Sequence, residues 1–371
     1  MAESQRKLIV PKDVTDALRT VKYPGSDEDV VRLEMPQEIR IAGQRISFSL
    51  VFQKSNDPNI EALVLACEEA IKIYVGAEVE IEDNIAVKFI HDMERPVLPN
   101  VKNIIAIASG KGGVGKSTVS VNLAVALANS GAKVGLLDAD IFGPSIPKMF
   151  GAEGDRPAGI KINEREMINP LEKYGVKFLS VGFFVDTDSA IIWRGPMASN
   201  ALKQLISEGN WGELDYLLID LPPGTSDIHL TMVQSVPVTG AVIVTTPQDV
   251  ALADVVRGAS MFQSKSIDVP VLGIVENMAW FTPAELPENK YYIFGKDGGK
   301  NLADKLGLPL LGQIPIVQSI REGGDSGNPI ANESETATGV SFAEVATAVK
   351  HRVHLRNIQM APTKKVKISR K

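Results

Sequence analysis

The stretch that decides the fold of this chain is Ser109-Gly110-Lys111-Gly112-Gly113-Val114-Gly115-Lys116-Ser117-Thr118. It follows the apolar, strand-like run Ile104–Ser109 and precedes the helix-like segment Val119–Asn129. Several backbone N–H groups must meet the oxygens of one phosphate group at once, and glycines permit the close wrapping that this requires. The pattern and its flanks therefore predict a Walker A phosphate-binding loop and disfavour the alternative, a glycine-rich turn without a ligand.

The polar side chains of this loop have expected roles in binding ATP. Lys116 is expected to reach the β- and γ-phosphates, and Ser117 to offer its hydroxyl to Mg²⁺. Lys111 is a second lysine in the loop, and we expect it to stabilise charge that develops on the transferred phosphoryl group. Together with the amide of a later residue, Asn277, the residues expected to contact the nucleotide are Gly110, Lys111, Gly112, Gly113, Val114, Gly115, Lys116, Ser117 and Thr118.

Three carboxylates are expected beside the phosphates. Asp138 and Asp140 come at the end of the apolar run Lys133–Asp138, and Asp220 ends the run Tyr216–Asp220. The carboxyl ends of parallel strands meet at one edge of a sheet. We therefore assign Asp220 as the Walker B residue, Asp138 as a carboxylate of the magnesium shell and Asp140 as the catalytic group that orients the attacking water. A helix N-cap or a turn remains the alternative for Asp138 and for Asp140.

Asn277 follows another apolar run, Val271–Glu276. Its amide offers both a donor and an acceptor, which suits the edge of adenine. The alternative is a local turn at the end of a strand.

Seven short apolar runs recur along residues 104–356, with helical or loop segments between them. They are Ile104–Ser109, Lys133–Asp138, Lys177–Val181, Tyr216–Asp220, Ala241–Thr246, Val271–Glu276 and Pro309–Pro315. Buried parallel strands have this pattern because crossover helices cover both faces of their sheet. The chain is therefore predicted to have an α/β fold, a P-loop NTPase domain with a mostly parallel sheet flanked by helices.

The residues on either side of this domain have other patterns. Residues 1–93 predict a small α+β domain with a helix from Val14, a hairpin, a second helix over 58–74 and two short strands. Residues 94–103 contain two prolines and are expected to form a linker. Residues 357–371 form a basic tail, which we interpret as solvated, with specific anion binding as the alternative.

The composition limits the classes of function. Of 371 residues, 44% are apolar and 23% are charged, values that are ordinary for globular proteins. A net charge of −6 gives no reason to expect a nucleic-acid partner, and no apolar run is long enough for a signal peptide or a membrane span. The sequence therefore predicts a cytoplasmic protein without a membrane partner. Cys67 is the only cysteine, which excludes an internal disulfide and a multi-thiolate metal site within one chain.

These motifs together resemble those of the Mrp/ApbC family of P-loop ATPases, a branch of the deviant Walker A class that includes MinD and ParA. The resemblance covers about 170 residues of the second domain, within the size range of a single domain. The matching segments are Gly110–Thr118, Leu137–Ser145, Asp220–Thr225, Thr246–Asp254 and Glu276–Met278. The N-terminal unit resembles a small domain of iron–sulfur assembly proteins, although Tyr23-Pro24-Gly25 stands where that domain has Asp-Pro-Glu.

The resemblance implies a homodimer that binds iron–sulfur clusters and, with ATP hydrolysis, delivers them to apoproteins. In this class Lys111 would reach the nucleotide of the partner subunit. The family holds its cluster with a Cys-x-x-Cys pair from each subunit, shortly after the Asn-Met segment, but the chain has no thiol there. The family's cluster site therefore cannot be assigned to any residue of this chain.

The remaining candidates for metal ligands are few. Cys67 follows the apolar face of a predicted helix and is expected in a core, with a two-thiolate site across a dimer as the alternative. His351 and His354 are expected to form a surface pair, and His229 to be structural or to support the site indirectly.

The sequence therefore predicts an ATP-hydrolysing, homodimeric iron–sulfur cluster carrier or assembly protein. Its expected partners are apoprotein clients or a cluster-bearing assembly protein. The alternatives are a MinD- or ParA-like positioning ATPase, an assembly ATPase that binds no cluster itself, and a ligase of the dethiobiotin synthetase kind.

Overall fold

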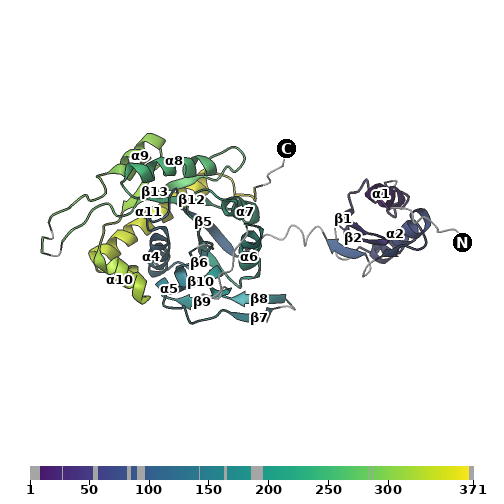
Figure 1. Cartoon of the computed structure of the whole chain (residues 1–371), viewed down its shortest axis with the longest axis horizontal. Coiled ribbons are helices and arrows are strands. Elements are labelled where there is room, and N and C mark those ends of the chain that lie inside the picture. The colour runs from purple at the N-terminus through teal and green to yellow at the C-terminus, as the bar shows by residue number, and fades with distance from the viewer. Residues whose placement is uncertain are drawn as a thin grey trace. The chain divides into compact units, whose positions relative to one another are not determined.

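The computed structural model describes residues 9–26, 28–52, 57–81, 85–89, 97–141, 143–162, 165–184, 195–283, 285–286 and 288–366. The chain divides into two compact units, residues 1–96 and 97–371 (Figure 1). The last five residues of the predicted tail, 367–371, and the first residues of the predicted linker, 94–96, lie outside the described residues.

The first unit packs two helices against a small sheet. Its elements are α1 (Pro11–Leu18), β1 (Pro36–Ala42), β2 (Arg45–Phe52), α2 (Ile60–Tyr74), β3 (Glu80–Ile81) and β4 (Ala86–Phe89). Strands β1 and β2 form the predicted antiparallel hairpin, and β3 and β4 pair parallel to β2. Val14, Leu18, Leu63 and Cys67 are buried together between the helices and the sheet. The prediction of a small α+β unit is therefore confirmed, and Cys67 lies in its core as expected.

The second unit is built on an eight-stranded sheet in the order β14-β13-β12-β5-β11-β6-β10-β9. The strands are β5 (Val101–Ser109), β6 (Val134–Asp138), β9 (Leu171–Lys173), β10 (Val176–Ser180), β11 (Leu214–Asp220), β12 (Gly240–Thr245), β13 (Val271–Glu276) and β14 (Leu310–Gln313). All are parallel except β9, which pairs antiparallel with β10. The seven predicted apolar runs are the seven parallel strands. The first of them begins at Val101, three residues before its predicted start.

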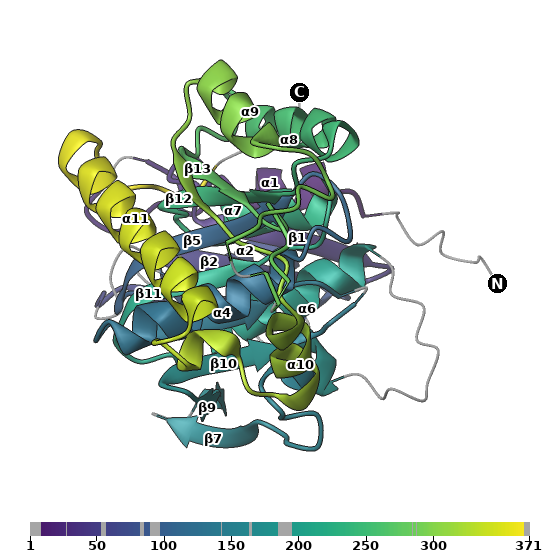
Figure 2. The same cartoon turned by 90° about the vertical axis from the view of Figure 1, so that its left-hand side faces the viewer.

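Helices cover both faces of this sheet. They are α4 (Lys116–Asn129), α5 (Ile146–Met149), α6 (Gly195–Glu208), α7 (Asp227–Ser235), α8 (Asp249–Phe262), α9 (Gly298–Leu306), α10 (Gln318–Ser326) and α11 (Ala337–Gln359), with short 3₁₀ turns η1 (Val181–Phe184) and η2 (Ile330–Asn332). Figure 2 shows α4 and α11 on the same face. Alternate residues of β5 serve the two cores: Ile105 and Ile107 pack on the α4 side, and Ile104 and Ala106 on the side of α6 to α9. The predicted doubly covered sheet is confirmed.

Two features of the second unit differ from the expectations. A separate antiparallel hairpin, β7 (Ala158–Ile162) with β8 (Arg165–Asn169), was not predicted. The first three residues of the predicted tail, 357–359, belong to α11. The segment that follows contacts the second unit: Val366 packs against its core, and the N–H of Val366 donates to the carbonyl of Val233 over 3.1 Å. Lys364 and Lys365 are exposed. Within the described ranges, no helix combines the length and apolarity needed to cross a bilayer.

Candidate nucleotide-binding site

The glycine-rich loop lies between the end of β5 and the start of α4, as predicted. Gly113 and Gly115 have φ angles of +82° and +79°, in the left-handed region that side-chain-bearing residues rarely adopt. A Cβ atom on Gly115 would also overlap the side-chain amide of Asn277. Ser109 closes the other end of the loop, since its Oγ donates to the carbonyl oxygen of Lys111 over 3.0 Å. Glycine is therefore required at position 115 both by backbone angle and by space.

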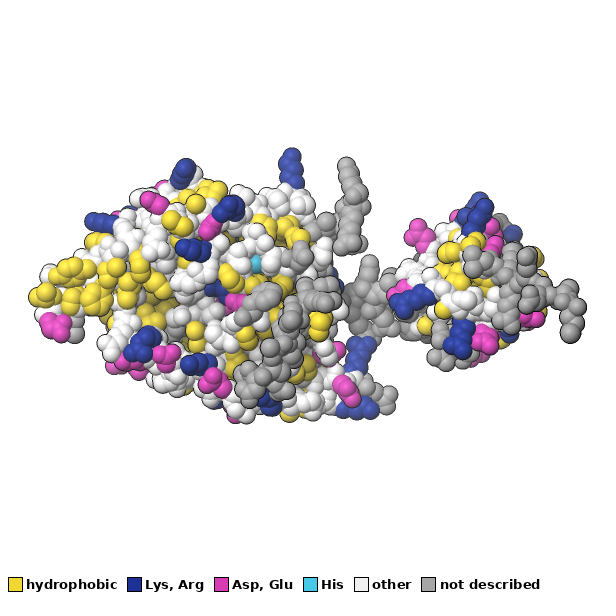
Figure 3. Space-filling view, viewed as in Figure 1, with side chains coloured by type: hydrophobic (Ala, Val, Ile, Leu, Met, Phe, Trp, Pro, Cys, Tyr) yellow, Lys and Arg dark blue, Asp and Glu magenta, His cyan; other side chains and the backbone are white. Residues whose placement is uncertain are grey.

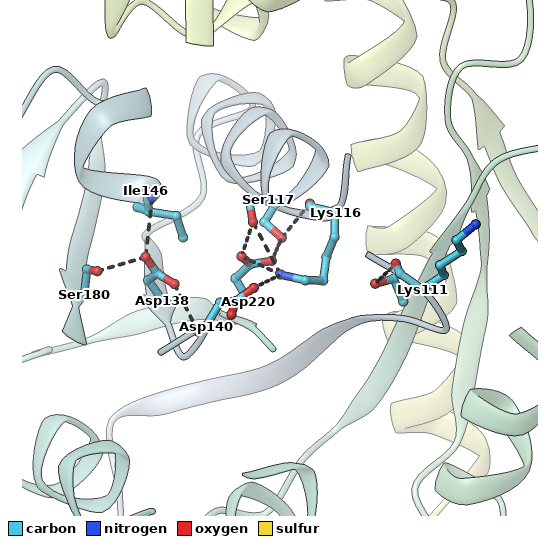
Figure 4. Close-up of polar contacts among 10 residues, drawn as sticks. Lys111, Lys116, Ser117, Asp138, Asp140, Ile146, Ser180 and Asp220 are labelled. Carbon is cyan, nitrogen blue, oxygen red and sulfur yellow. Dashed lines mark hydrogen bonds and ion pairs between the residues drawn. The ribbon is translucent and has the colours of Figure 1, made fainter. Parts of the chain in front are cut away.

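Lys116 and Asp220 form the centre of the site (Figure 4). Lys116 Nζ lies 2.8 Å from Asp220 Oδ2, and the side chains are 6% and 0% exposed. Two hydroxyls complete the shell of the carboxylate: Ser117 Oγ donates to Oδ2 and Ser120 Oγ to Oδ1, each over 2.6 Å. Lys116 Nζ also lies 3.7 Å from Oδ2 of Asp140. The predicted phosphate-loop lysine and serine and the predicted Walker B carboxylate are thus brought together.

Asp138 lies beside this centre and is wholly buried. Its Oδ2 accepts from Ser180 Oγ over 2.8 Å and from the N–H of Ile146 over 3.4 Å, while its Oδ1 accepts from the N–H of Asp140 over 3.1 Å. Burial, and then repulsion from Asp220, raises the pKa of Asp138 to about 7. The hydrogen bond from the N–H of Asp140 is the contact expected if Asp138 were a turn residue. Asp138 makes this turn contact and also lies next to Asp220.

Strand register explains why the carboxylates meet. Asp220 on β11 is paired with Asp138 on β6, and Asp138 is paired with Ser180 on β10, so three neighbouring parallel strands end at the same level. Ser180 and Ser120 were not predicted. Ser180 shares the signal of the aspartates, a polar residue at the carboxyl end of an apolar run. Ser120 had a weaker signal, because a single serine in an apolar helix also commonly bonds the helix backbone, as Ser120 does to the carbonyl of Lys116.

Lys111 and Asn277 occupy different surroundings. Lys111 is exposed, and its side chain points away from the Lys116–Asp220 centre (Figure 4). Asn277 is 5% exposed, and its Nδ2 donates to the carbonyl oxygen of Val114 in the phosphate loop over 2.8 Å. The structure therefore places Asn277 against the loop itself. Its contact with adenine stays a prediction.

His229 is buried near the site, at the start of α7. Its Nδ1 accepts from the N–H of Ser226 over 3.2 Å, and its Nε2 has no hydrogen-bond partner among the described residues. Burial lowers the pKa of His229 to about 4, and the charge of Lys116 contributes. The imidazole is therefore neutral at physiological pH. His351 and His354 are exposed, and within the part of the chain that the structure describes no group of three or more His, Cys, Asp or Glu side chains is arranged to hold a metal ion.

The fold and this site define the class of the protein. A glycine-rich loop between a strand and a helix, with carboxylates at the carboxyl edge of a mostly parallel sheet, makes it a P-loop NTPase of the MinD/ParA-like fold. Among solved structures, the chain is similar to a nucleotide-binding protein from Archaeoglobus fulgidus in complex with ADP (38% identity, TM-score 0.56, 66% of this chain and 94% of that chain). It is also similar to the septum site-determining protein MinD from Pyrococcus horikoshii, complexed with Mg-ADP (25% identity, TM-score 0.50, 68% and 98%).

The family follows from sequence comparison. Residues 100–350 match the model of the NUBPL iron-transfer P-loop NTPases, and the chain belongs to that family. Residues 11–82 match an iron-sulfur cluster assembly protein domain. An iron-sulfur cluster carrier protein from Synechocystis is 45% identical over 346 residues, which cover 92% of this chain and 97% of the relative. An iron-sulfur cluster transfer protein NUBPL from Dictyostelium discoideum is 48% identical over 262 residues, 70% of this chain and 79% of the relative. The resemblance seen in the motifs is thus confirmed.

Proposed function

We propose that this chain is a homodimeric, Mg²⁺-dependent ATPase that takes part in delivering iron–sulfur clusters to apoproteins. The observation that carries the ATPase part is the contact of Lys116 and Ser117 with the buried carboxylate of Asp220, directly beneath the glycine-rich loop. Support for the delivery part comes from the relatives, which are named as iron–sulfur cluster carrier and transfer proteins.

The oxygen donors of the site fit a magnesium ion. Ser117, Asp138 and Asp220 offer a hydroxyl and carboxylates, the hard ligands that Mg²⁺ prefers. Asp138 and Asp220 are both wholly buried and lie close enough for one to raise the pKa of the other. A divalent cation held by these side chains would reduce that repulsion. Bound there with ATP, Mg²⁺ would neutralise charge on the β- and γ-phosphate oxygens.

The remaining residues would bind and orient the nucleotide. Backbone N–H groups of the loop and of the start of α4 would hold the phosphate oxygens. Lys116 would exchange its contact with Asp220 for the β- and γ-phosphates. Asp140 Oδ2 lies 3.7 Å from Lys116 Nζ, at the carboxyl edge of the sheet. There it would accept a hydrogen bond from the attacking water. Lys111 is exposed and directed away from its own site, which supports the proposal that it acts in the site of a partner subunit.

The cluster itself is cargo that this chain is not equipped to ligate alone. Cluster ligands are mostly cysteine thiolates, and Cys67, the only cysteine, is 0% exposed in the core of the first unit. Burial raises the pKa of Cys67 to about 12, so the thiolate is strongly disfavoured. We therefore propose that the chain works with a separate cluster-bearing protein and supplies the ATP-dependent step.

The ATPase part can be tested by calorimetry with Mg-ATP and by phosphate release. Lys116→Ala should abolish detectable binding, Lys111→Ala should retain binding but lose hydrolysis at least tenfold, and the exposed control Lys161→Ala should match wild type. Folded wild-type protein that binds neither ATP nor ADP would overturn the proposal.

The cargo part can be tested by anaerobic incubation with iron and sulfide, followed by absorbance and iron quantitation. Wild type and Cys67→Ala should both lack a stoichiometric cluster. A cluster bound by wild type and lost in Cys67→Ala would show that the core thiol is a ligand and would refute the need for a separate cluster-bearing protein.

A further inference from the structure

A cavity of about 280 Å³ lies in the second unit at the edge of the sheet opposite the nucleotide site. It is lined by Val101 and Ile104 at the start of β5, by Thr239 directly before β12, and by the end of α11 with the segment that follows it. The phosphate loop follows the other end of β5, so the length of this strand separates the two sites. A cavity of this size is slightly smaller than the pockets that hold drug-sized molecules and suits a smaller organic ligand.

The buried side chain of Arg356 contributes a positive charge to the lining of this cavity. Arg356 is 8% exposed. Its Nη1 donates to Asn357 Oδ1 over 3.2 Å, and its Nη2 donates to the carbonyl of Ala361 and to Thr363 Oγ1, over 2.8 and 3.1 Å. Its Nε has no hydrogen-bond partner among the described residues. All of these acceptors are neutral, so none of them balances the charge of the guanidinium.

No carboxylate compensates for this burial within the part of the chain that the structure describes. Arg356 forms no ion pair there, and burial lowers its pKa without an opposing contribution from a nearby acid. The partial negative charge at the C-terminal end of α11 offsets only part of a full positive charge. A buried charge without its counter-charge is unfavourable. An anion bound beside Arg356 would therefore be strongly favoured.

The surrounding sequence is also short of acidic residues. Figure 3 shows Lys and Arg side chains beside Asp and Glu side chains over much of the visible face of the second unit. Residues 345–371 differ, because they contain eight lysines and arginines and no aspartate or glutamate. Arg352 lies one turn before Arg356 on α11, and its Nε likewise lacks a partner among the described residues. The local charge at this end of α11 is therefore positive.

The other residues that line the cavity suit an anion with an apolar body. Thr239 Oγ1 accepts from the N–H of Ile104 over 3.0 Å, and Thr363 Oγ1 accepts from Arg356. Neither hydroxyl donates to a described residue, so both O–H groups are available to an oxyanion. Lys102 also lines the cavity, but its charge is paired with Asp215 over 2.8 Å. The apolar part of the lining consists of Val101, Ile104, Pro237, Met360 and Pro362.

A chain of amide hydrogen bonds holds the guanidinium in place. Asn357 Oδ1 accepts from Arg356, and Asn357 Nδ2 donates to Asn103 Oδ1 over 2.8 Å. Asn103 Nδ2 in turn donates to the carbonyl of Asp215 at the start of β11, over 3.0 Å. Arg356 is thus fixed to two strands of the sheet before any ligand binds. A donor that is already positioned loses little conformational freedom on binding.

We propose that this cavity binds a small organic anion, a carboxylate or phosphate group on a short apolar body, with Arg356 as its counter-charge. The anionic group is placed against Arg356 and the hydroxyls of Thr239 and Thr363. The apolar body is placed against the apolar part of the lining. The inference is independent of the proposed ATPase and delivery functions, since it uses the opposite edge of the sheet.

Ligand-observed NMR titration of the full chain tests the proposal with four probes: hexanoate, acetate, hexyl phosphate and inorganic phosphate. Saturating Mg-ADP is present throughout, so that the phosphate loop is occupied. Hexanoate, hexyl phosphate or both should bind wild type at one site, at least tenfold more tightly than acetate or inorganic phosphate respectively, because the longer probes also bury apolar surface. The comparison of hexanoate with hexyl phosphate identifies which anionic group the site prefers.

Two variants locate the bound probe. Arg356→Gln removes the charge and should weaken binding of the preferred probe at least tenfold. Arg352→Gln is the matched control, because Arg352 is on the same helix, has the same unpartnered Nε and does not line the cavity. It should change the affinity by less than twofold. Both variants should bind Mg-ADP as wild type does.

Thr363→Val provides a second test that keeps Arg356 and nearly the same side-chain shape. It removes one O–H donor and should weaken the preferred probe at least threefold. If Arg356→Gln also fails to bind Mg-ADP, its fold is disturbed and Thr363→Val alone decides.

Three results would overturn the proposal. The first is wild type that binds neither hexanoate nor hexyl phosphate. The second is equal affinity of wild type and the variants that line the cavity. The third is an equal loss in Arg352→Gln and Arg356→Gln, which would assign the binding to the general charge of α11 instead of the cavity.

Discussion

Lys116 Nζ lies 2.8 Å from Asp220 Oδ2 in a pair that is almost wholly removed from solvent. Removing one partner leaves the other charge buried without its counter-charge, which costs on the order of 3 kcal/mol. Lys116→Ala and Asp220→Ala should therefore each destabilise the nucleotide-free protein by about this much, while the double variant should cost clearly less than the sum. Urea unfolding of the four proteins measures the coupling. Strictly additive costs would show that the pair is not energetically coupled.

Replacement of Gly115 separates backbone strain from crowding in the loop. Gly115→Ala should combine about 1 kcal/mol of left-handed strain with displacement of the Asn277 amide. Gly131→Ala is the matched control, since Gly131 has a φ of +88° but open space around its Cβ position. We expect both variants to be less stable in urea and only Gly115→Ala to lose nucleotide affinity, by at least tenfold in calorimetry. Equal affinities would mean that the loop tolerates displacement of the amide.

Asn277 has one observed contact and one predicted contact, and they can be distinguished. Asn277→Ala removes the hydrogen bond to Val114. It should lower the free energy of unfolding by about 1 kcal/mol and weaken the binding of all nucleoside triphosphates. If the amide also reads adenine, the preference for ATP over GTP should fall in competition binding. An equal loss of affinity for ATP and GTP would limit the role of Asn277 to supporting the loop.

The neutral imidazole of His229 makes stability depend on pH. Its pKa of about 4 in the folded protein lies below the ordinary value near 6.5, so the unfolded chain takes up a proton first as the pH falls. The contribution of His229 is therefore fully present above pH 6.5 and is lost between pH 6.5 and 4. Between pH 7 and pH 5 the free energy of unfolding of wild type should fall by about 2 kcal/mol more than that of His229→Asn.

Urea unfolding at the two pH values measures this difference. The exposed His351 supplies the control, His351→Asn, for which the difference from wild type should not change. If the difference in free energy of unfolding between wild type and His229→Asn were the same at both pH values, His229 would be charged in the folded state or would reach solvent.

The sheet could be predicted because its parallel strands are covered on both faces. Such strands are continuous apolar runs, and all seven were recognised from sequence with small errors at their ends. The hairpin of β7 and β8 escaped because it buries little: Lys161, Arg165 and Glu166 are exposed, and the apolar alternation is weak. An edge strand as short as β9 gives still less signal.

The candidate site was predictable to the extent that its residues belong to local motifs. The loop and the aspartates stand at the ends of apolar runs, where parallel topology brings them to one edge. The bond from Asn277 to Val114 joins residues 163 positions apart and depends on the order of strands in the sheet, which no local pattern specifies. For the same reason, Ser180 could not be matched with Asp138 before β10 was known to lie beside β6.

The burial of the only cysteine has a practical consequence for work at the bench. Oxidation of cysteine in air acts on accessible thiolates, and the only cysteine of this chain is buried. ATP turnover by the purified chain should therefore be the same whether it is prepared in a glove box or under ordinary atmosphere. Any sensitivity to oxygen that appears when extracts are added back would then report on a companion molecule and provide an assay for isolating it.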